Sequence, residues 1–111
     1  MSPPPRPLDA LQTTIRERAA SADAGSSWTA KLLAGGLQEI GPKVTEEAGE
    51  LVEAAGEPGE AGREHFVYEA ADLLYHAMVL FRWRGVDLEE VEQELQRRFG
   101  TSGLTEKASR R

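Results

Sequence analysis

The chain of 111 residues is 40% apolar and 29% charged, proportions that fit one folded domain and exclude a wholly disordered chain. It contains no cysteine, which excludes disulfides, thiolate metal sites and cysteine nucleophiles. Its net charge of −6 is uneven, because residues 46–94 hold three basic and fourteen acidic residues, a net −11, whereas residues 1–45 carry +1 and residues 95–111 carry +4. An acidic centre repels nucleic-acid phosphates, so we expect no nucleic-acid partner.

No segment predicts a membrane span or a signal peptide. The longest uncharged apolar run, Ala77 to Phe81, is far shorter than the roughly 20 residues that a membrane-spanning helix needs. Four of the six prolines fall within residues 1–7, which lack the apolar core of a signal peptide. We therefore expect a cytoplasmic protein with no membrane partner, in which residues 1–8 form a disordered, proline-rich tail.

In the first half of the chain, apolar residues recur at helical spacing in three places. The pattern predicts a helix over residues 9–20 and a short helix over residues 28–33, which Gly35 and Gly36 end. The next stripe predicts a helix that starts cleanly only at Lys43, because proline is tolerated in the first turn of a helix and Pro42 precedes it.

The second half predicts two further helices. Residues 60–83 carry a broad apolar face, and Gly85 follows as a left-handed cap. Asp87 and Glu90 have the spacing of a capping box for a last helix, which Gly100 ends. No alternating strand pattern occurs. We expect an all-α, antiparallel bundle of four to five helices within residues 9–100, a basic tail over 101–111, and a homodimer that covers the broad apolar face.

Two pairs of carboxylates fall at the edges of the apolar stripes. At about 100° per residue, Glu47 and Glu50 border one stripe, and Glu69 and Asp72 lie on the shoulder of the next. Antiparallel helices would bring the pairs together, where their mutual repulsion raises each pKa unless a cation is bound. Oxygen ligands favour Mg²⁺, with Mn²⁺ as the alternative. Spacing alone leaves open that these are solvated faces of acidic helices.

The motifs that contain these acids resemble those of a known family. Residues 46–50 (Glu-Glu-Ala-Gly-Glu) and 69–72 (Glu-Ala-Ala-Asp) resemble the signature of the all-α nucleoside-triphosphate pyrophosphatases, which bind Mg²⁺. Three further stretches resemble the phosphoribosyl-ATP pyrophosphohydrolase branch, which acts in histidine biosynthesis: residues 27–33, 40–44 and 103–110. The resemblance covers the chain from about residue 27 to residue 110.

The resemblance implies Mg²⁺-dependent hydrolysis of phosphoribosyl-ATP to phosphoribosyl-AMP and pyrophosphate, with cleavage between the α- and β-phosphates. It implies that the metal ligands are Glu47, Glu50, Glu69 and Asp72. Glu46 and Glu53 would be the catalytic groups that lie outside the ligands or hold the attacking water. Thr45 departs from the pattern, because a small residue, often glycine, is expected before the paired acids.

The same resemblance suggests substrate-binding residues: Ser27, Trp28, Thr29, Lys31, Lys43, Lys107 and Arg110. The four cations are candidates for phosphate contacts, and Trp28 for stacking on the adenine. Other roles stay open, since Lys43 could pair with Glu47, Trp28 could belong to the core or a dimer interface, and Arg110 could be part of a solvated tail. We expect Ser27 to cap its loop and His76 to be packed rather than to be a ligand.

Two other functions compete with this interpretation. A house-cleaning pyrophosphatase for canonical or damaged nucleotides would share the acidic cluster, but the loop at Ser27 and the basic C-terminal motif argue against it. A non-catalytic helical interaction module, with its acids merely on the surface, predicts that Mg²⁺ leaves the melting temperature unchanged.

Overall fold

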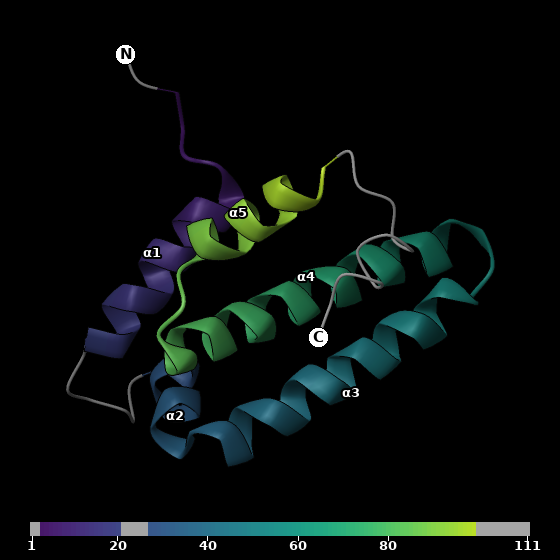
Figure 1. Cartoon of the computed structure of the whole chain (residues 1–111). Coiled ribbons are helices and arrows are strands. Elements are labelled where there is room, and N and C mark those ends of the chain that lie inside the picture. Colours follow the sequence, from purple (N-terminus) through teal and green to yellow (C-terminus); the bar gives the residue numbers. More distant parts are fainter. Residues whose placement is uncertain (1–2, 21–26, 100–111) are drawn as a thin grey trace, which may run out of the picture.

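A computed structural model describes residues 3–20 and 27–99 of the chain. Within those residues the secondary structure is entirely helical, which confirms the all-α expectation. Figure 1 shows the helices in chain order: α1 (Pro7–Ala20), α2 (Trp28–Gly35), α3 (Leu37–Ala55), α4 (Gly59–Arg84) and α5 (Leu88–Arg98). None of these helices is both long and apolar enough to cross a membrane.

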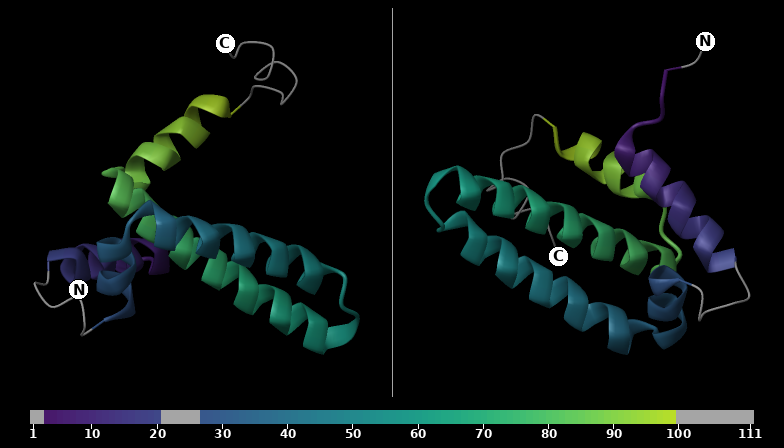
Figure 2. Two further views of the ribbon diagram at one scale, coloured as in Figure 1. Left: turned by 90° about the horizontal axis from the view of Figure 1, so that it is seen from below. Right: turned by 180° about the vertical axis from the view of Figure 1, so that it is seen from behind.

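The two longest helices, α3 and α4, form an antiparallel hairpin and make the most extensive contact in the fold (Figure 1). Residues 56–58 join them, and so short a link favours antiparallel neighbours. The short helix α2 packs against both α3 and α4, and α1 packs against α2 and α4. Helix α5 projects away from the hairpin (Figure 2). The antiparallel arrangement brings the two predicted carboxylate pairs to facing helices.

The apolar core lies at the end of the hairpin where α2 covers it. All five helices contribute buried side chains there: Ile15, Leu32, Ile40, Met78, Val79 and Leu88. The half of the hairpin nearer its link buries little apolar surface, and Val52, Phe66 and Val67 are exposed there. The core therefore supports the base of the hairpin, while its outer half presents apolar side chains to solvent.

Two helices begin earlier than the sequence predicts. Helix α3 starts at Leu37 rather than at Lys43, and it contains Pro42 beyond its first turn. A proline ring clashes with the Cβ of the residue before it in a helix, but that residue is Gly41, which has no Cβ. The proline still lacks an N–H and its ring still crowds the carbonyl four residues earlier, so Gly41 removes one part of the cost. Helix α1 starts at Pro7 rather than at residue 9, with proline at the favoured first position.

The turn between α4 and α5 confirms the predicted caps. Gly85 has φ 78°, in the left-handed region, where an L side chain would be strained. The backbone N–H of Asp87 donates to a Glu90 carboxylate oxygen at 2.9 Å, as part of a capping box. These caps fix where α4 ends and α5 begins.

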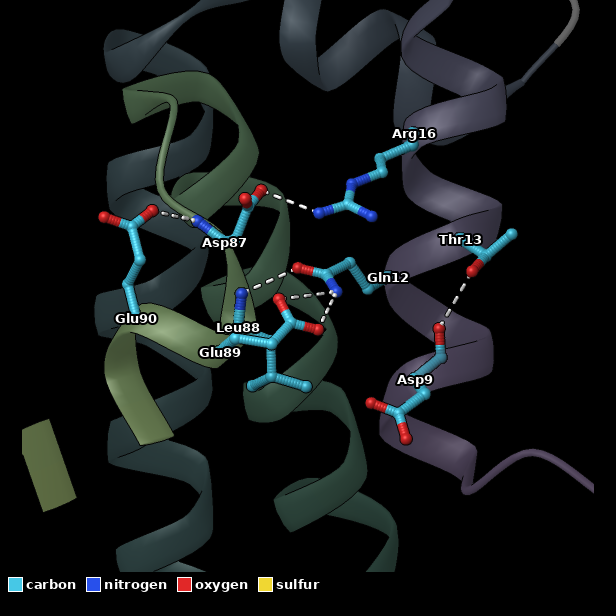
Figure 3. Close-up of polar contacts among 8 residues, drawn as sticks. All are labelled: Asp9, Gln12, Thr13, Arg16, Asp87, Leu88, Glu89 and Glu90. Carbon is cyan, nitrogen blue, oxygen red and sulfur yellow. Dashed lines mark hydrogen bonds and ion pairs between the residues drawn. The ribbon is translucent and has the colours of Figure 1, made fainter. Parts of the chain in front are cut away.

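Helix α1 holds the first turn of α5 by polar contacts, which Figure 3 shows in detail. The side-chain oxygen of Gln12 accepts the backbone N–H of Leu88 at 2.6 Å, and its amide group donates to Glu89 at 3.0 Å. Arg16 pairs with Asp87 at 2.7 Å. Since the first N–H groups of a helix have no partner within it, Gln12 satisfies a donor that α5 cannot satisfy itself.

Candidate metal centre

Three carboxylates converge between the facing sides of α3 and α4. Glu47 and Glu50 are three residues apart on α3, and Glu69 comes from α4; one oxygen from each lies within 4.8 Å of the others. Glu47 and Glu69 are only 7% and 6% exposed, and Glu50 is half-buried. The helical spacing of the acids and the antiparallel hairpin together produce this cluster, which we call the carboxylate cluster.

The cluster strongly disfavours negative charge in the absence of a cation. Burial, a hydrogen bond with Glu69 and the charges of Asp72 and Glu50 raise the pKa of Glu47 to about 7. The pKa of Glu50 is also raised, chiefly through its hydrogen bond with Glu69. Asp72 is half-buried and acts on Glu47 through its charge, although it is not one of the three converging carboxylates. The repulsion expected from the sequence is therefore present.

The polar atoms left over in the cluster fit a bound divalent cation. One oxygen of Glu47 and one of Glu69, Oε2 in each case, is buried and has no hydrogen-bond partner among residues 3–20 and 27–99. Buried polar atoms normally find partners, because an unpaired one has lost its hydration without compensation. Carboxylate oxygens are the donors that Mg²⁺ and Mn²⁺ prefer. The donor set and the unpaired oxygens thus suit such a cation.

His65 contacts the cluster and was not predicted as a site residue. Its Nε2 lies 3.2 Å from Glu69 Oε1, and its Nδ1 lies 3.0 Å from both carboxylate oxygens of Glu57. The Glu57 carboxylate is the main reason that the pKa of His65 is raised. The signal in the sequence was the spacing of four residues between His65 and Glu69, which places them on one helix face.

His76 is buried, as expected from the sequence. Its Nδ1 donates to the backbone carbonyl of Asp72 at 2.9 Å, and its Nε2 is buried and without a partner in the described part of the chain. Its ring also meets the Tyr75 ring edge-on, with centroids 4.9 Å apart. His76 is a packed residue outside the carboxylate cluster.

The two remaining acids of the predicted site are exposed on α3. Glu46 pairs with Lys43 at 3.7 Å, and Glu53 lies outside the carboxylate cluster. The alternative pairing of Lys43 with Glu47 is wrong, because the Glu47 side chain is buried in the carboxylate cluster. Catalytic roles for Glu46 and Glu53 stay predictions.

A groove of about 220 Å³ lies beside the start of α3, lined by Trp28, Lys31, Leu32, Gly35 and Glu39. The Nζ of Lys43 is 5.9 Å from the centre of the Trp28 ring, within reach of a cation–π contact. Eight residues of helix, about 12 Å along the axis, separate Glu39 from Glu47. The groove and the carboxylate cluster therefore lie along the same helix, with Lys43 between them.

The other predicted substrate-binding residues have different surroundings. Ser27 caps α2, as expected, by accepting the Ala30 backbone N–H at 2.9 Å. Thr29 is buried, and its hydroxyl is 2.5 Å from that of Tyr75. Contact of either residue with substrate stays a prediction. Lys107 and Arg110 lie outside the described residues.

The fold and the site define an all-α protein with facing carboxylates suited to a hard divalent cation. Residues 8–99 match the model of the phosphoribosyl-ATP pyrophosphohydrolase family, and the chain belongs to that family.

Three curated relatives illustrate the similarity. The phosphoribosyl-ATP pyrophosphatase of Rhodopirellula baltica is 64% identical over 104 residues, which span 94% of this chain and 86% of the relative. That of Geobacter metallireducens is 50% identical over 103 residues, 93% of this chain and 91% of the relative. A histidine biosynthesis bifunctional protein of Wolinella succinogenes is 51% identical over 90 residues, 81% of this chain but 38% of the longer relative.

Proposed function

We propose that this chain hydrolyses phosphoribosyl-ATP to phosphoribosyl-AMP and pyrophosphate in histidine biosynthesis, and that it does so with Mg²⁺. Membership of the family supports the substrate and the reaction. The observation that carries the metal requirement is the pair of buried carboxylate oxygens on Glu47 and Glu69 that have no partner within the described residues. Glu50 and Asp72 complete the ligand set that we propose.

The arrangement of the carboxylate cluster and of the groove at α2 supports different roles for the two places. Glu47, Glu50, Glu69 and Asp72 would hold a divalent cation, which would supply positive charge to offset the triphosphate and polarise the phosphorus. Lys31 and Lys43 supply further positive charge at the groove, and the exposed Trp28 ring offers a stacking surface for the adenine. Glu46 or Glu53 would orient the water whose oxygen bonds to phosphorus as the bridging P–O bond breaks.

The outer half of the hairpin supports a homodimer. Apolar side chains are exposed along α4, with Phe66 39%, Val67 57% and Leu74 48% accessible, and Val52 on α3 is 73% accessible. Large contiguous apolar patches on a protein surface mark sites where a partner binds. A second copy of the chain is the partner we propose. We also propose a cytoplasmic location, without membrane or nucleic-acid partners.

Pyrophosphate release from phosphoribosyl-ATP, measured with and without Mg²⁺, tests the proposed activity. Ordinary and modified nucleoside triphosphates serve as competing substrates, and Mn²⁺ as the alternative cation. We expect strong preference for phosphoribosyl-ATP and loss of turnover when a chelator removes the metal. Activity confined to other nucleotides would assign a house-cleaning role instead. No activity on any substrate, with folded protein, would contradict an enzymatic role.

A further inference from the structure

A histidine bridge connects the α3–α4 link to the carboxylate cluster. We use this name for Glu57, His65 and Glu69. Both oxygens of Glu57 lie 3.0 Å from His65 Nδ1, and Glu69 Oε1 lies 3.2 Å from His65 Nε2. Each ring nitrogen of His65 thus lies within hydrogen-bond distance of a different carboxyl group, Nδ1 of Glu57 and Nε2 of Glu69. Within the described residues, His65 is the one basic side chain in ion-pair contact with a member of the carboxylate cluster.

The local backbone is shaped to make this bridge. His65 and Glu69 are one helical turn apart on α4, whereas Glu57 lies in the link and reaches His65 across the first turns of α4. Gly62 permits the approach, because a Cβ at that position would collide with the backbone and the Cβ of Glu57. Gly62 is buried, and its nearest neighbours are atoms of Glu57. The link therefore packs closely enough for Glu57 to hold the imidazole ring.

The bridge uses one oxygen of Glu69 and leaves the other free. Oε1 lies 3.2 Å from His65 Nε2, while Oε2 is buried and has no hydrogen-bond partner in the described part of the chain. A carboxylate with one oxygen fixed has fewer orientations to lose when the second oxygen binds a cation. Groups that hydrogen-bond to metal ligands commonly set metal affinity in this way.

We propose that His65, held by Glu57, is a positioning residue that orients the Glu69 carboxylate for a divalent cation. This inference rests on the proposed function, since it assumes that the carboxylate cluster binds the cation. His65 itself is not a ligand here, because both of its nitrogens are already engaged with carboxylates.

Two substitutions of His65 test its contacts with Glu57 and Glu69 one at a time. In His65→Gln, the amide nitrogen takes the place of Nε2 and keeps the contact with Glu69. In His65→Asn, the shorter amide takes the place of Nδ1, so that only the contact with Glu57 remains. Arg63→Ala is the matched control, because Arg63 is an exposed neighbour on α4 that pairs only with Glu60 among the described residues.

The readout is binding of Mn²⁺ alone, measured from the electron paramagnetic resonance signal of the free ion without substrate. We expect His65→Asn to weaken Mn²⁺ binding about tenfold or more, in the range found for groups behind a metal ligand. The Mn²⁺ affinities of His65→Gln and Arg63→Ala should stay within about threefold of the wild-type affinity. Glu57→Ala changes a residue of the link rather than of α4, and it should weaken Mn²⁺ binding severalfold. This variant tests the bridge if the His65 variants do not fold. Circular dichroism checks the fold of each variant.

Three results would overturn the proposal: Mn²⁺ binding by His65→Asn as tight as in the wild type, tighter binding, or equal weakening in His65→Asn and His65→Gln. Tighter binding would mean that the histidine mainly repels the cation. Any of these results, with a wild type that binds Mn²⁺, leaves the proposed function intact. A wild type that binds no Mn²⁺ removes the cation site itself, and with it the metal requirement of the proposed function.

Discussion

Glu47 and Glu69 face each other from α3 and α4, and each has one buried carboxylate oxygen that no other described residue hydrogen-bonds. Such an arrangement lowers the stability of the protein when both groups are ionised and nothing compensates them. The metal-free protein and the metal-bound protein should therefore respond differently to pH and to substitution of these acids.

The stability of the metal-free protein should fall as the pH rises from about 4.5 to about 7. The pKa of Glu47 is 4.5 as an ordinary carboxyl group and about 7 in the folded chain. Over that interval the unfolded chain has lost this proton while the folded chain retains it, so unfolding becomes easier. Below pH 4.5 Glu47 is protonated in both the folded and the unfolded chain. Above pH 7 it is ionised in both, so its effect on the free energy of unfolding no longer changes with pH.

Calorimetry of Glu47→Gln measures how much the ionisation of Glu47 lowers the stability of the metal-free protein. The variant should melt at a higher temperature than the wild type at pH 8 and at nearly the same temperature at pH 5, with a chelator present. Glu60→Gln, at an exposed position on α4, is the control and should track the wild type at both pH values. A difference between Glu47→Gln and the wild type that does not change with pH would contradict the prediction.

Glu50→Gln should lose activity without losing structure. The amide keeps the volume of the side chain and relieves repulsion, but it removes a negative oxygen from the carboxylate cluster. We expect turnover of phosphoribosyl-ATP to fall by about 100-fold or more, as when one preorganised electrostatic group is removed from an active site, with unchanged helical circular dichroism. Normal turnover would exclude Glu50 from the ligands.

Lys31→Ala should raise KM for phosphoribosyl-ATP and change kcat little. Lys31 lines the groove beside Trp28 and is remote in sequence from the carboxylate cluster. Loss of one hydrogen bond to a charged phosphate corresponds to about a tenfold rise in KM. Steady-state kinetics measures both constants, with Arg82→Ala as a control on the exposed surface of α4. A fall in kcat at constant KM would place Lys31 at the reacting phosphates instead.

Asp87→Ala should destabilise the fold by about 0.5–2 kcal/mol, the usual cost of losing a helix N-cap. It removes the capping box of α5 and the contact with Arg16 (Figure 3). Asp87→Asn keeps a good capping group and loses only the charge, so its urea midpoint should lie closer to that of the wild type. Equal destabilisation by both substitutions would assign the effect to the ion pair with Arg16.

Val67→Glu should convert the proposed dimer into a monomer. Val67 is 57% exposed on the outer half of α4. A charged side chain there stays hydrated in a monomer, whereas burial in a dimer interface would remove its hydration and destabilise the dimer. Sedimentation velocity should give about twice the chain mass of 12.1 kDa for the wild type and the single mass for the variant. Glu60→Lys is the control. A wild type that sediments as a monomer would contradict the dimer.

The sequence predicted the carboxylate cluster because helical spacing and a short link are local properties. Glu47 and Glu50 are three residues apart, and the 18 residues that precede Glu69 suffice to end one helix and return along the next. The capping box at Asp87 was readable for the same reason. The sequence did not predict how deeply Glu47 is buried, because its burial depends on how closely α4 packs against α3.

Two features escaped prediction because they depend on particular neighbours. The start of α3 was wrong because the general rule against internal proline ignores that Gly41 has no Cβ to clash. The histidine bridge was missed because Glu57 lies in the link, outside both helices, so helical spacing does not tell where its side chain lies relative to His65. Only the close packing of the link against Gly62 brings them together.

The position of the core at one end of the hairpin has a consequence for hydrogen exchange. Amides around Val79 and Ile40, where five helices meet, should exchange only when the whole fold opens, whereas amides near Ala54 and Gly62 should exchange through local fraying of the hairpin tip. The carboxylate cluster lies between these two regions. A cation bound there would join α3 to α4 at the point where apolar packing ends. Amide hydrogens at the hairpin tip should then exchange more slowly when the cation is added.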